Sequence, residues 1–184
     1  MKPLCPKVCV CLLALFLLSC SDTADPESVV IGSHSPDFDL TSLDGSRVTS
    51  TSLKGEIVVL NFWATFCQPC RAEIPELNSF AASSGAKVIG ITLDPEGIPA
   101  VRQYEQEQNL KLNYTVLLGN EEIFTRFNGV GIPYTLVLDR AQRIVSIYRH
   151  PVDRETLERD LRKINQGGPG TVSLSQDGHD RKAE

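Results

Sequence analysis

The hydrophobic pattern along this chain alternates between short apolar runs and segments with helical spacing. The run Ile57–Ala64 is rich in β-branched and aromatic residues and predicts a buried strand. The segment that follows, 69–83, has the spacing of a helix with one apolar face, formed by Ala72, Ile74, Leu77 and Phe80. A strand followed at once by a helix is the first indication of an α/β fold.

The same alternation continues to about residue 165. Two short runs, 37–40 and 47–49, flank a turn at Leu43-Asp44-Gly45 and are expected to pair as a hairpin. A last helix is expected after Asp153, which is a suitable N-cap residue. We expect further strands at 87–93, 114–118, 134–138 and 143–148, and further helices at 100–108 and 121–127. Strands that alternate with helices predict a sheet with helices on its faces.

The two ends of the chain differ from this pattern. Residues 1–7 are positively charged, residues 8–18 are apolar, and a run of that length suits a signal sequence better than a membrane-spanning helix. The sequence Leu17-Leu18-Ser19-Cys20 is similar to a bacterial lipobox, which implies cleavage before Cys20 and its lipidation; an ordinary signal peptide or an uncleaved anchor are the alternatives. We therefore predict four regions, namely a signal peptide (1–19), a flexible tether (20–31), a globular domain (32–165) and a disordered tail (166–184).

Composition and charge limit the possible partners. The chain has 41% hydrophobic and 22% charged residues, which suffices for one globular core. Its formal net charge is −5 and no basic cluster stands out, so nucleic acid is not an expected partner. We found no internal repeat, and we expect a monomer.

The cysteines carry the candidate chemistry. Of the six, four lie in the first 20 residues, so cleavage and lipidation would leave only Cys67 and Cys70 as thiols. Two cysteines so close in sequence close a very small loop and could stabilise the chain little, which favours a reactive role. Cys67 is expected at a helix N-terminus, where unpaired N–H groups and the helix dipole favour the thiolate. We predict that Cys67 is the exposed nucleophile and that Cys70 resolves the mixed disulfide.

The segment 61–75, which contains Cys67-Gln68-Pro69-Cys70, resembles the active-site segment of thioredoxin-fold thiol–disulfide oxidoreductases of the TlpA, ResA and CcmG type, a thioredoxin-like group related to AhpC/TSA proteins. The segments 131–135 and 35–45 are similar to the cis-proline turn and the N-terminal hairpin of that family. The resemblance implies a thioredoxin fold, with a central mixed β-sheet flanked by helices, an N-terminal β-hairpin, and a strand–helix insertion between Asp94 and Asn113.

The resemblance also implies a substrate-binding surface around the dithiol. A cis Pro133 would place the backbone of Ile132 beside Cys67, where in related proteins the bound substrate strand pairs. The substrate contacts expected from the active-site segment are Phe66, Gln68 and Pro69. The family often has Trp where this chain has Phe66, so we expect partner recognition to differ.

The chain also differs from thioredoxin in the group available for proton transfer to Cys70. Thioredoxin carries a buried carboxylate where this chain has Asn61, and an amide cannot accept a proton in that way. Glu73, one turn after Cys70, is the nearest candidate, with a structural or surface acid as the alternative interpretation. Asp94, at the end of the strand 87–93, is a weaker candidate.

The function predicted from these features is a membrane-anchored thiol–disulfide oxidoreductase outside the cytoplasm, on the periplasmic side in a Gram-negative cell. It would need no cofactor beyond its dithiol. Because Gln68-Pro69 contains no histidine to stabilise a Cys67 thiolate, we favour a reductant of protein disulfides over an oxidant. A reductant there needs a membrane thiol-relay partner as electron donor and disulfide-containing client proteins, and the resemblance suggests cytochrome c maturation as one setting.

Two alternatives belong to other functional classes. A peroxiredoxin-like thiol peroxidase would have threonine three residues before its reactive cysteine, whereas Thr65 lies two residues before Cys67. A copper- or metal-handling protein would need more ligands than one cysteine pair, and the histidines His34, His150 and His179 are distant in sequence. We therefore predict no metal site.

Overall fold

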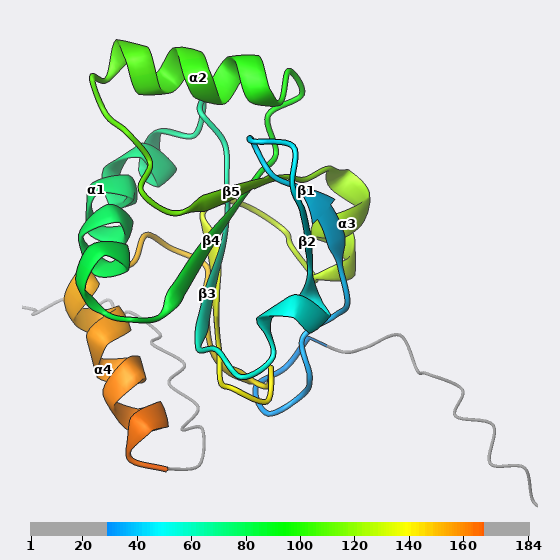
Figure 1. The fold of residues 1–184 in the computed structure, drawn as a ribbon, viewed down its shortest axis with the longest axis vertical. Helices are drawn as coiled ribbons and strands as arrows, with labels where there is room; N and C mark the ends of the chain where they lie inside the picture. Colours follow the sequence, from blue (N-terminus) through cyan, green and yellow to red (C-terminus); the bar gives the residue numbers. More distant parts are fainter. Residues whose placement is uncertain (1–28, 168–184) are drawn as a thin grey trace, which may run out of the picture.

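A computed structural model describes residues 29–167 of the chain (Figure 1). The predicted signal peptide, the lipidation at Cys20, most of the tether and nearly all of the tail lie outside these residues. The described part contains a five-stranded sheet in the order β5-β4-β3-β6-β7 and a two-stranded hairpin, β1-β2. The strands are β1 (Asp39–Thr41), β2 (Arg47–Thr49), β3 (Val58–Trp63), β4 (Lys87–Thr92), β5 (Thr115–Leu118), β6 (Tyr134–Leu138) and β7 (Ile144–Tyr148). The helices are α1 (Gln68–Ser83), α2 (Ile98–Glu107), α3 (Glu121–Arg126) and α4 (Arg154–Asn165), with a 3-10 turn at Ser50–Leu53.

Strand β3 is the centre of the sheet, and all six of its residues are buried. This is why its sequence is an almost continuous apolar run, because both faces of a central strand are covered. It pairs in parallel with β4 and antiparallel with β6, so the sheet is mixed. The pairing places Asn61 between Gly90 of β4 and Thr135 of β6. The predicted thioredoxin fold is confirmed.

Two layers cover the sheet (Figure 1). Helices α1 and α4 lie together on one face, while α3 and the hairpin lie on the other. The core on the hairpin side contains Phe38, Phe62, Phe127 and Tyr134, and the core on the helix side contains Val59, Leu77, Phe80 and Leu157. A third apolar cluster surrounds Cys67 and Cys70 together with Trp63 and Tyr104. The cysteine pair therefore lies at the end of a packed core.

The hairpin forms as expected, whereas the insertion differs in detail from the prediction. Between Asp94 and Asn113 the chain forms only the helix α2, and the strand expected with it is β5, which begins at Thr115. Most of helix α2 is exposed, and its two buried residues are Val101 and Tyr104. The Tyr104 ring meets the Trp63 ring edge-on at a centroid distance of 5.8 Å, so α2 packs beside the active-site segment.

The packed part of the chain begins earlier than the boundary predicted at residue 32. Val29 is buried in the core on the hairpin side, and the Gly32 backbone N–H donates to the Ile144 carbonyl at 2.8 Å. The last residues assigned to the tether, 29–31, therefore belong to the globular domain. Their polar neighbours at 21–28 concealed this in the sequence.

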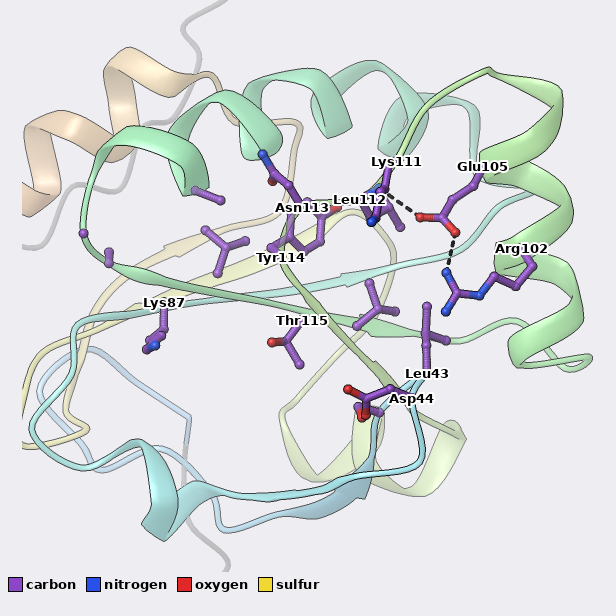
Figure 2. A pocket seen from close by; sticks show the side chains of 16 residues that line it. Leu43, Asp44, Lys87, Arg102, Glu105, Lys111, Leu112, Asn113, Tyr114 and Thr115 are labelled. Atoms are coloured by element: carbon purple, nitrogen blue, oxygen red, sulfur yellow. Dashed lines mark hydrogen bonds and ion pairs between the residues drawn. The ribbon is translucent and has the colours of Figure 1, made fainter.

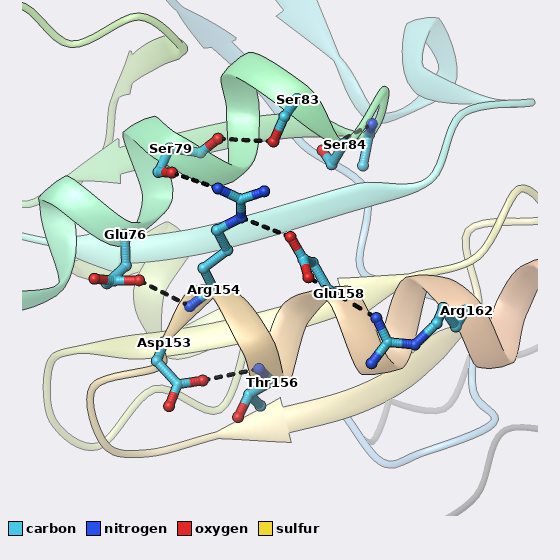
Figure 3. A network of polar contacts seen from close by, with 10 residues as sticks. Glu76, Ser79, Ser83, Ser84, Asp153, Arg154, Thr156, Glu158 and Arg162 are labelled. Atoms are coloured by element: carbon cyan, nitrogen blue, oxygen red, sulfur yellow. Dashed lines mark hydrogen bonds and ion pairs between the residues drawn. The ribbon is translucent and has the colours of Figure 1, made fainter.

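Helix α4 is fastened to α1 through its first residue, Arg154 (Figure 3). The Arg154 backbone N–H donates to Glu76 Oε2 at 3.2 Å, and its guanidinium donates to Ser79 Oγ at 3.0 Å and to Glu158 Oε1 at 2.6 Å. The contacts with Glu76 and Ser79 hold the start of α4, and with it the end of the preceding loop 149–153, against α1. The position of that loop matters for the site described below.

The N-cap of α4 offers a direct test of this arrangement. The Asp153 side chain accepts from the Thr156 backbone N–H at 2.8 Å. We expect Asp153→Ala to lower the free energy of unfolding by about 1 kcal/mol, because one N–H of the first turn loses its acceptor. Asp153→Asn is the matched control and should stay within a few tenths of a kcal/mol of the wild type. Urea denaturation followed by circular dichroism measures both; equal losses in the two variants would contradict the capping role.

Candidate active site

The two cysteines lie where β3 ends and α1 begins. They form a disulfide, with their Cα atoms 5.3 Å apart. Cys67 is the N-cap of α1, and its sulfur accepts from the Cys70 backbone N–H at 3.2 Å. The helix begins here because Pro69 pre-sets its first turn and lacks an N–H that would otherwise need a partner.

The two sulfurs differ in their access to solvent. Cys70 is fully buried, and Cys67 is 8% exposed. Cys67 is thus much less exposed than the sequence analysis predicted, because the apolar cluster around Trp63 and Tyr104 encloses the pair. It is still the only one of the two that a partner could reach in this state.

The segment before β6 forms the wall opposite Cys67. The Ile132–Pro133 peptide bond is cis, and the Ile132 carbonyl oxygen lies 3.7 Å from Cys67 Sγ. Phe66 is 69% exposed beside the dithiol, Val130 is 88% exposed in the loop that precedes Ile132, and both are accessible to a partner. Gln68 and Pro69 are also exposed. The structure brings all of the expected substrate contacts to one end of the molecule, and their role in binding stays a prediction.

Glu73 is an interior residue, not a surface acid. It is 2% exposed, its Oε1 accepts from Asn61 Nδ2 at 2.7 Å, and its Oε2 accepts from the Val152 backbone N–H at 3.0 Å. Burial raises the pKa of the Glu73 carboxyl to about 7 from an ordinary value of 4.5, against the opposing effect of these two hydrogen bonds and of His150. Glu73 and the fully buried Cys70 are three residues apart and so lie on the same side of α1. A carboxyl with a pKa near 7, one helical turn from a buried cysteine, is suited to proton transfer.

Asn61 explains how the chain manages without a carboxylate on β3. Its Nδ2 donates both to Glu73 and to Thr135 Oγ1, the latter at 2.9 Å, while its Oδ1 has no hydrogen-bond partner within residues 29–167. An amide turned by half a revolution would present that oxygen to a protonated Glu73 and to the Thr135 hydroxyl. Asn61 can therefore match either protonation state of Glu73, which is a positioning role that the sequence alone did not reveal.

We expect Asn61→Asp to disrupt this pair. A second carboxyl would lie within hydrogen-bond distance of Glu73, and two buried carboxylates repel each other, so one of them would stay protonated above pH 7. The free energy of unfolding at pH 8 should fall by roughly 3 kcal/mol, with a much smaller loss at pH 5, where at least one of the two groups carries a proton. Chemical denaturation at the two pH values measures this. An equal loss at both would mean that packing, and not charge, is responsible.

The Asp94 carboxylate has hydrogen-bond donors on both of its oxygens. Its carboxylate accepts from the Thr65 backbone N–H and hydroxyl and from the Thr92 hydroxyl, and the residue is 5% exposed. These donors bind the two carboxylate oxygens, so the structure gives no support to the proton-transfer role that we considered for Asp94. It anchors the turn before Cys67 instead.

A cavity of about 810 Å³ lies away from the dithiol (Figure 2). Its wall includes Leu43 of the hairpin turn, Tyr114, and Glu105, whose Oε1 accepts from the Leu112 backbone N–H at 2.9 Å. Neither cysteine lines it. It therefore has no direct part in the chemistry of the dithiol.

Two further observations concern metals and membranes. Within residues 29–167 no group of three or more His, Cys, Asp or Glu side chains could hold a metal ion. In the same part of the chain, no helix combines the length and the apolar content that crossing a membrane requires.

Comparison with known proteins agrees with this geometry. Residues 31–148 match the model of the AhpC/TSA family, a range that includes both cysteines and Pro133. The thiol-disulfide oxidoreductase ResA of Bacillus thuringiensis is 33% identical over 145 residues, which cover 77% of this chain and 82% of the relative. Among solved structures, a thioredoxin-family thiol:disulfide interchange protein of Chlorobium tepidum is 30% identical with a TM-score of 0.61, covering 71% of this chain and 94% of that one. A secreted disulfide oxidoreductase of Mycobacterium tuberculosis, homologous to E. coli DsbE, is 25% identical with a TM-score of 0.59, covering 68% and 94%.

Proposed function

The chain belongs to the AhpC/TSA family and is a thiol–disulfide oxidoreductase of the ResA/DsbE type, and from this premise we propose that it reduces disulfide bonds of client proteins outside the cytoplasm. The observation that carries the proposal is the arrangement of the two sulfurs. Cys67 keeps some exposed surface next to the exposed Phe66, its sulfur lies 3.7 Å from the Ile132 carbonyl oxygen, and it is bonded to the fully buried Cys70. One chain supplies both sulfurs, so we expect it to act as a monomer.

The proposed reaction has two exchange steps. The Cys67 thiolate attacks one sulfur of a client disulfide, a Cys67–client bond forms, and the other client sulfur leaves as a thiolate that takes up a proton. The Cys70 thiolate then attacks Cys67, the Cys67–Cys70 bond forms, and the second client thiol is released. Two electrons pass from the protein to the client, and Glu73 receives the proton that Cys70 loses.

The direction of electron flow follows from what surrounds Cys67. Strong oxidants owe their potential to a stabilised reduced form. Here the two residues between the cysteines, Gln68 and Pro69, offer no positive charge to the Cys67 thiolate. We therefore propose a reductant that is itself reduced by a membrane thiol-relay protein.

The reduction potential tests this direction. We expect equilibration with reduced and oxidised glutathione to give a potential close to that of thioredoxin, about −270 mV. A potential near that of the oxidant DsbA, about −120 mV, would reverse the proposed direction without removing the oxidoreductase activity. Reduction of insulin disulfides, with a Cys67→Ser variant as the blank, checks that the measured exchange belongs to this dithiol.

We further propose that lipid on Cys20 anchors the protein to a membrane. The support is the charged start of the chain, the apolar run 8–18 and Ser19-Cys20 after it. Mass spectrometry of membrane fractions should show a mature chain that begins at a lipid-modified Cys20, and Cys20→Ser should release it or block processing. A membrane-bound chain that still begins at Met1 would overturn the proposal.

For the clients, we propose that cytochrome c maturation is among the processes served. The support is the resemblance to the ResA and CcmG type. A Cys70→Ser variant expressed in the native cell should retain its clients as mixed disulfides, with c-type apocytochromes or their assembly proteins among them. A set of trapped clients without any such protein would reject this assignment.

A further inference from the structure

The Asp94 carboxylate is buried directly beneath the turn that carries Cys67. Its Oδ1 and Oδ2 accept from the Thr65 backbone N–H at 3.1 and 3.0 Å. The Thr65 hydroxyl donates to Oδ1 and the Thr92 hydroxyl to Oδ2, each at 2.5 Å. Charge-assisted hydrogen bonds of this kind are the strong ones, so the carboxylate ties the end of β4 to the end of β3.

Among the described residues, this buried carboxylate has no partner in an ion pair. Within residues 29–167, no Lys, Arg or His nitrogen lies within 4.0 Å of an Asp94 oxygen. Asp94 lines a cavity of about 460 Å³ together with Thr65 and Phe66, and the ionisable residues of its other walls are Arg71, Glu96, Tyr104 and Glu107. The Arg71 guanidinium lies 5.1 Å above the centre of the Tyr104 ring. The groups that contact the carboxylate directly are therefore hydrogen-bond donors without a positive charge, and a charge in the interior acts over a longer range than one in water.

Two residues of chain and a few hydrogen bonds connect Asp94 to the turn that carries Cys67. Thr65 is two residues before Cys67, and the Cys67 backbone N–H closes the turn by donating to the Ala64 carbonyl at 3.1 Å. The base of the turn is fixed as well, because the Leu93 N–H donates to the Trp63 carbonyl at 2.8 Å. The Asp94 carboxylate is thus connected by direct hydrogen bonds to the turn that presents Cys67.

We propose that Asp94 is a positioning residue that sets the reactivity of Cys67, by holding Thr65 and by keeping a negative charge beneath the turn that disfavours the Cys67 thiolate. The inference rests on the proposed function, since it concerns the same dithiol. It also gives that function a physical cause, because a thiolate that is less stable makes the reduced form a better electron donor.

The sign of the effect can be read from one balanced equilibrium. The protein disulfide reacts with two glutathione molecules to give the protein dithiol and one oxidised glutathione. A charge that destabilises the Cys67 thiolate raises the free energy of the dithiol side. Removing that charge should shift the equilibrium toward the dithiol wherever Cys67 is ionised.

Two substitutions should act in opposite directions. Asp94→Asn removes the charge and keeps an oxygen that can accept from Thr65. Thr65→Val keeps the charge and the backbone hydrogen bonds but removes the hydroxyl that partly balances the carboxylate. Glu96→Gln is the matched control, because Glu96 lines the same cavity but is exposed to solvent.

The experiment measures the alkylation rate of Cys67 in the reduced protein between pH 5 and pH 10, with iodoacetamide and site identification by mass spectrometry. We expect the midpoint of the profile to fall by about one pH unit in Asp94→Asn, to rise in Thr65→Val, and to stay unchanged in Glu96→Gln. Above both midpoints, the glutathione equilibrium of Asp94→Asn should shift about tenfold toward the dithiol, or about 30 mV.

A merely structural Asp94 would lower the thermal midpoint of unfolding in Asp94→Asn and Thr65→Val and leave both Cys67 profiles in place, which would overturn the inference. Shifts in the same direction for the two variants would overturn it too. If Asp94→Asn does not fold, the upward shift in Thr65→Val decides alone. A wild-type protein that does not exchange with glutathione at all would refute the proposed function instead.

Discussion

Cys67→Ser is expected to lower disulfide-reductase activity by roughly 10³-fold or more, the scale of loss when an enzyme loses its nucleophile. The structure gives the reason, because Cys67 is the only sulfur of the pair with any exposed surface and a partner cannot reach Cys70 directly. Cys70→Ser should stop turnover for a different reason. It leaves the first exchange intact and removes the sulfur that completes the second.

The two variants therefore differ in their products. Incubated with a disulfide substrate, reduced Cys70→Ser should accumulate a mixed disulfide on Cys67, visible as an added mass, and Cys67→Ser should accumulate none. Circular dichroism serves as the control for folding, since Ser differs from Cys by one atom. If the Cys67→Ser protein formed a mixed disulfide on Cys70 as fast as Cys70→Ser forms one on Cys67, the assignment of Cys67 as the nucleophile would be wrong.

The sequence predicted the dithiol because its signals are local. A strand-like run, a cysteine at the predicted N-terminus of a helix and a proline inside the pair all lie within 57–75, and the structure places a disulfide at that point. The strands and helices of the sheet were predictable for the same reason. Each carries its own periodicity, and their alternation predicts an α/β sheet with helices on its faces. The thioredoxin fold itself was implied by the resemblance of the segments 61–75 and 131–135 to a known family.

The surroundings of the dithiol could not be predicted because they come from residues far apart in sequence. Thr135 meets Asn61 across the β3–β6 register, 74 positions along the chain, and Val152 reaches Glu73 from 79 positions away. No local pattern encodes such a pairing, so Glu73 remained open between a surface acid and a proton carrier. The same limit applies to Cys67, which lies in one buried cluster with Tyr104 from the separate helix α2.

Glu73→Gln is expected to lower turnover about 10²-fold at neutral pH, which is the lower end of what general acid–base catalysis contributes. The wild-type rate should rise with pH through about 7 as the carboxyl loses its proton and becomes able to accept one from Cys70. In Glu73→Gln this inflection should disappear. The measurement is the rate at which Cys70 resolves a preformed mixed disulfide, between pH 5 and pH 9. An inflection near pH 7 that survives in Glu73→Gln would assign it to another group.

The Glu73 carboxyl should also make the free energy of unfolding depend on pH. The native pKa of about 7 lies above the ordinary value of 4.5, so the native state binds more protons than the unfolded state between these pH values. The free energy of unfolding should therefore be highest below pH 4.5 with respect to this group and fall by roughly 3 kcal/mol as the pH rises through 7. Glu73→Gln should remove that slope and keep the fold. The Asn61 amide can turn so that its oxygen accepts from the amide nitrogen of the new glutamine, whose oxygen can still accept from the Val152 N–H. Denaturation of the disulfide form in urea, at half-unit steps from pH 4 to pH 8, compares the two proteins. A difference between wild type and Glu73→Gln that has the opposite slope would show that the carboxylate, and not the acid, is the stable native form of Glu73. That result would remove the physical basis for proton transfer by Glu73 at neutral pH.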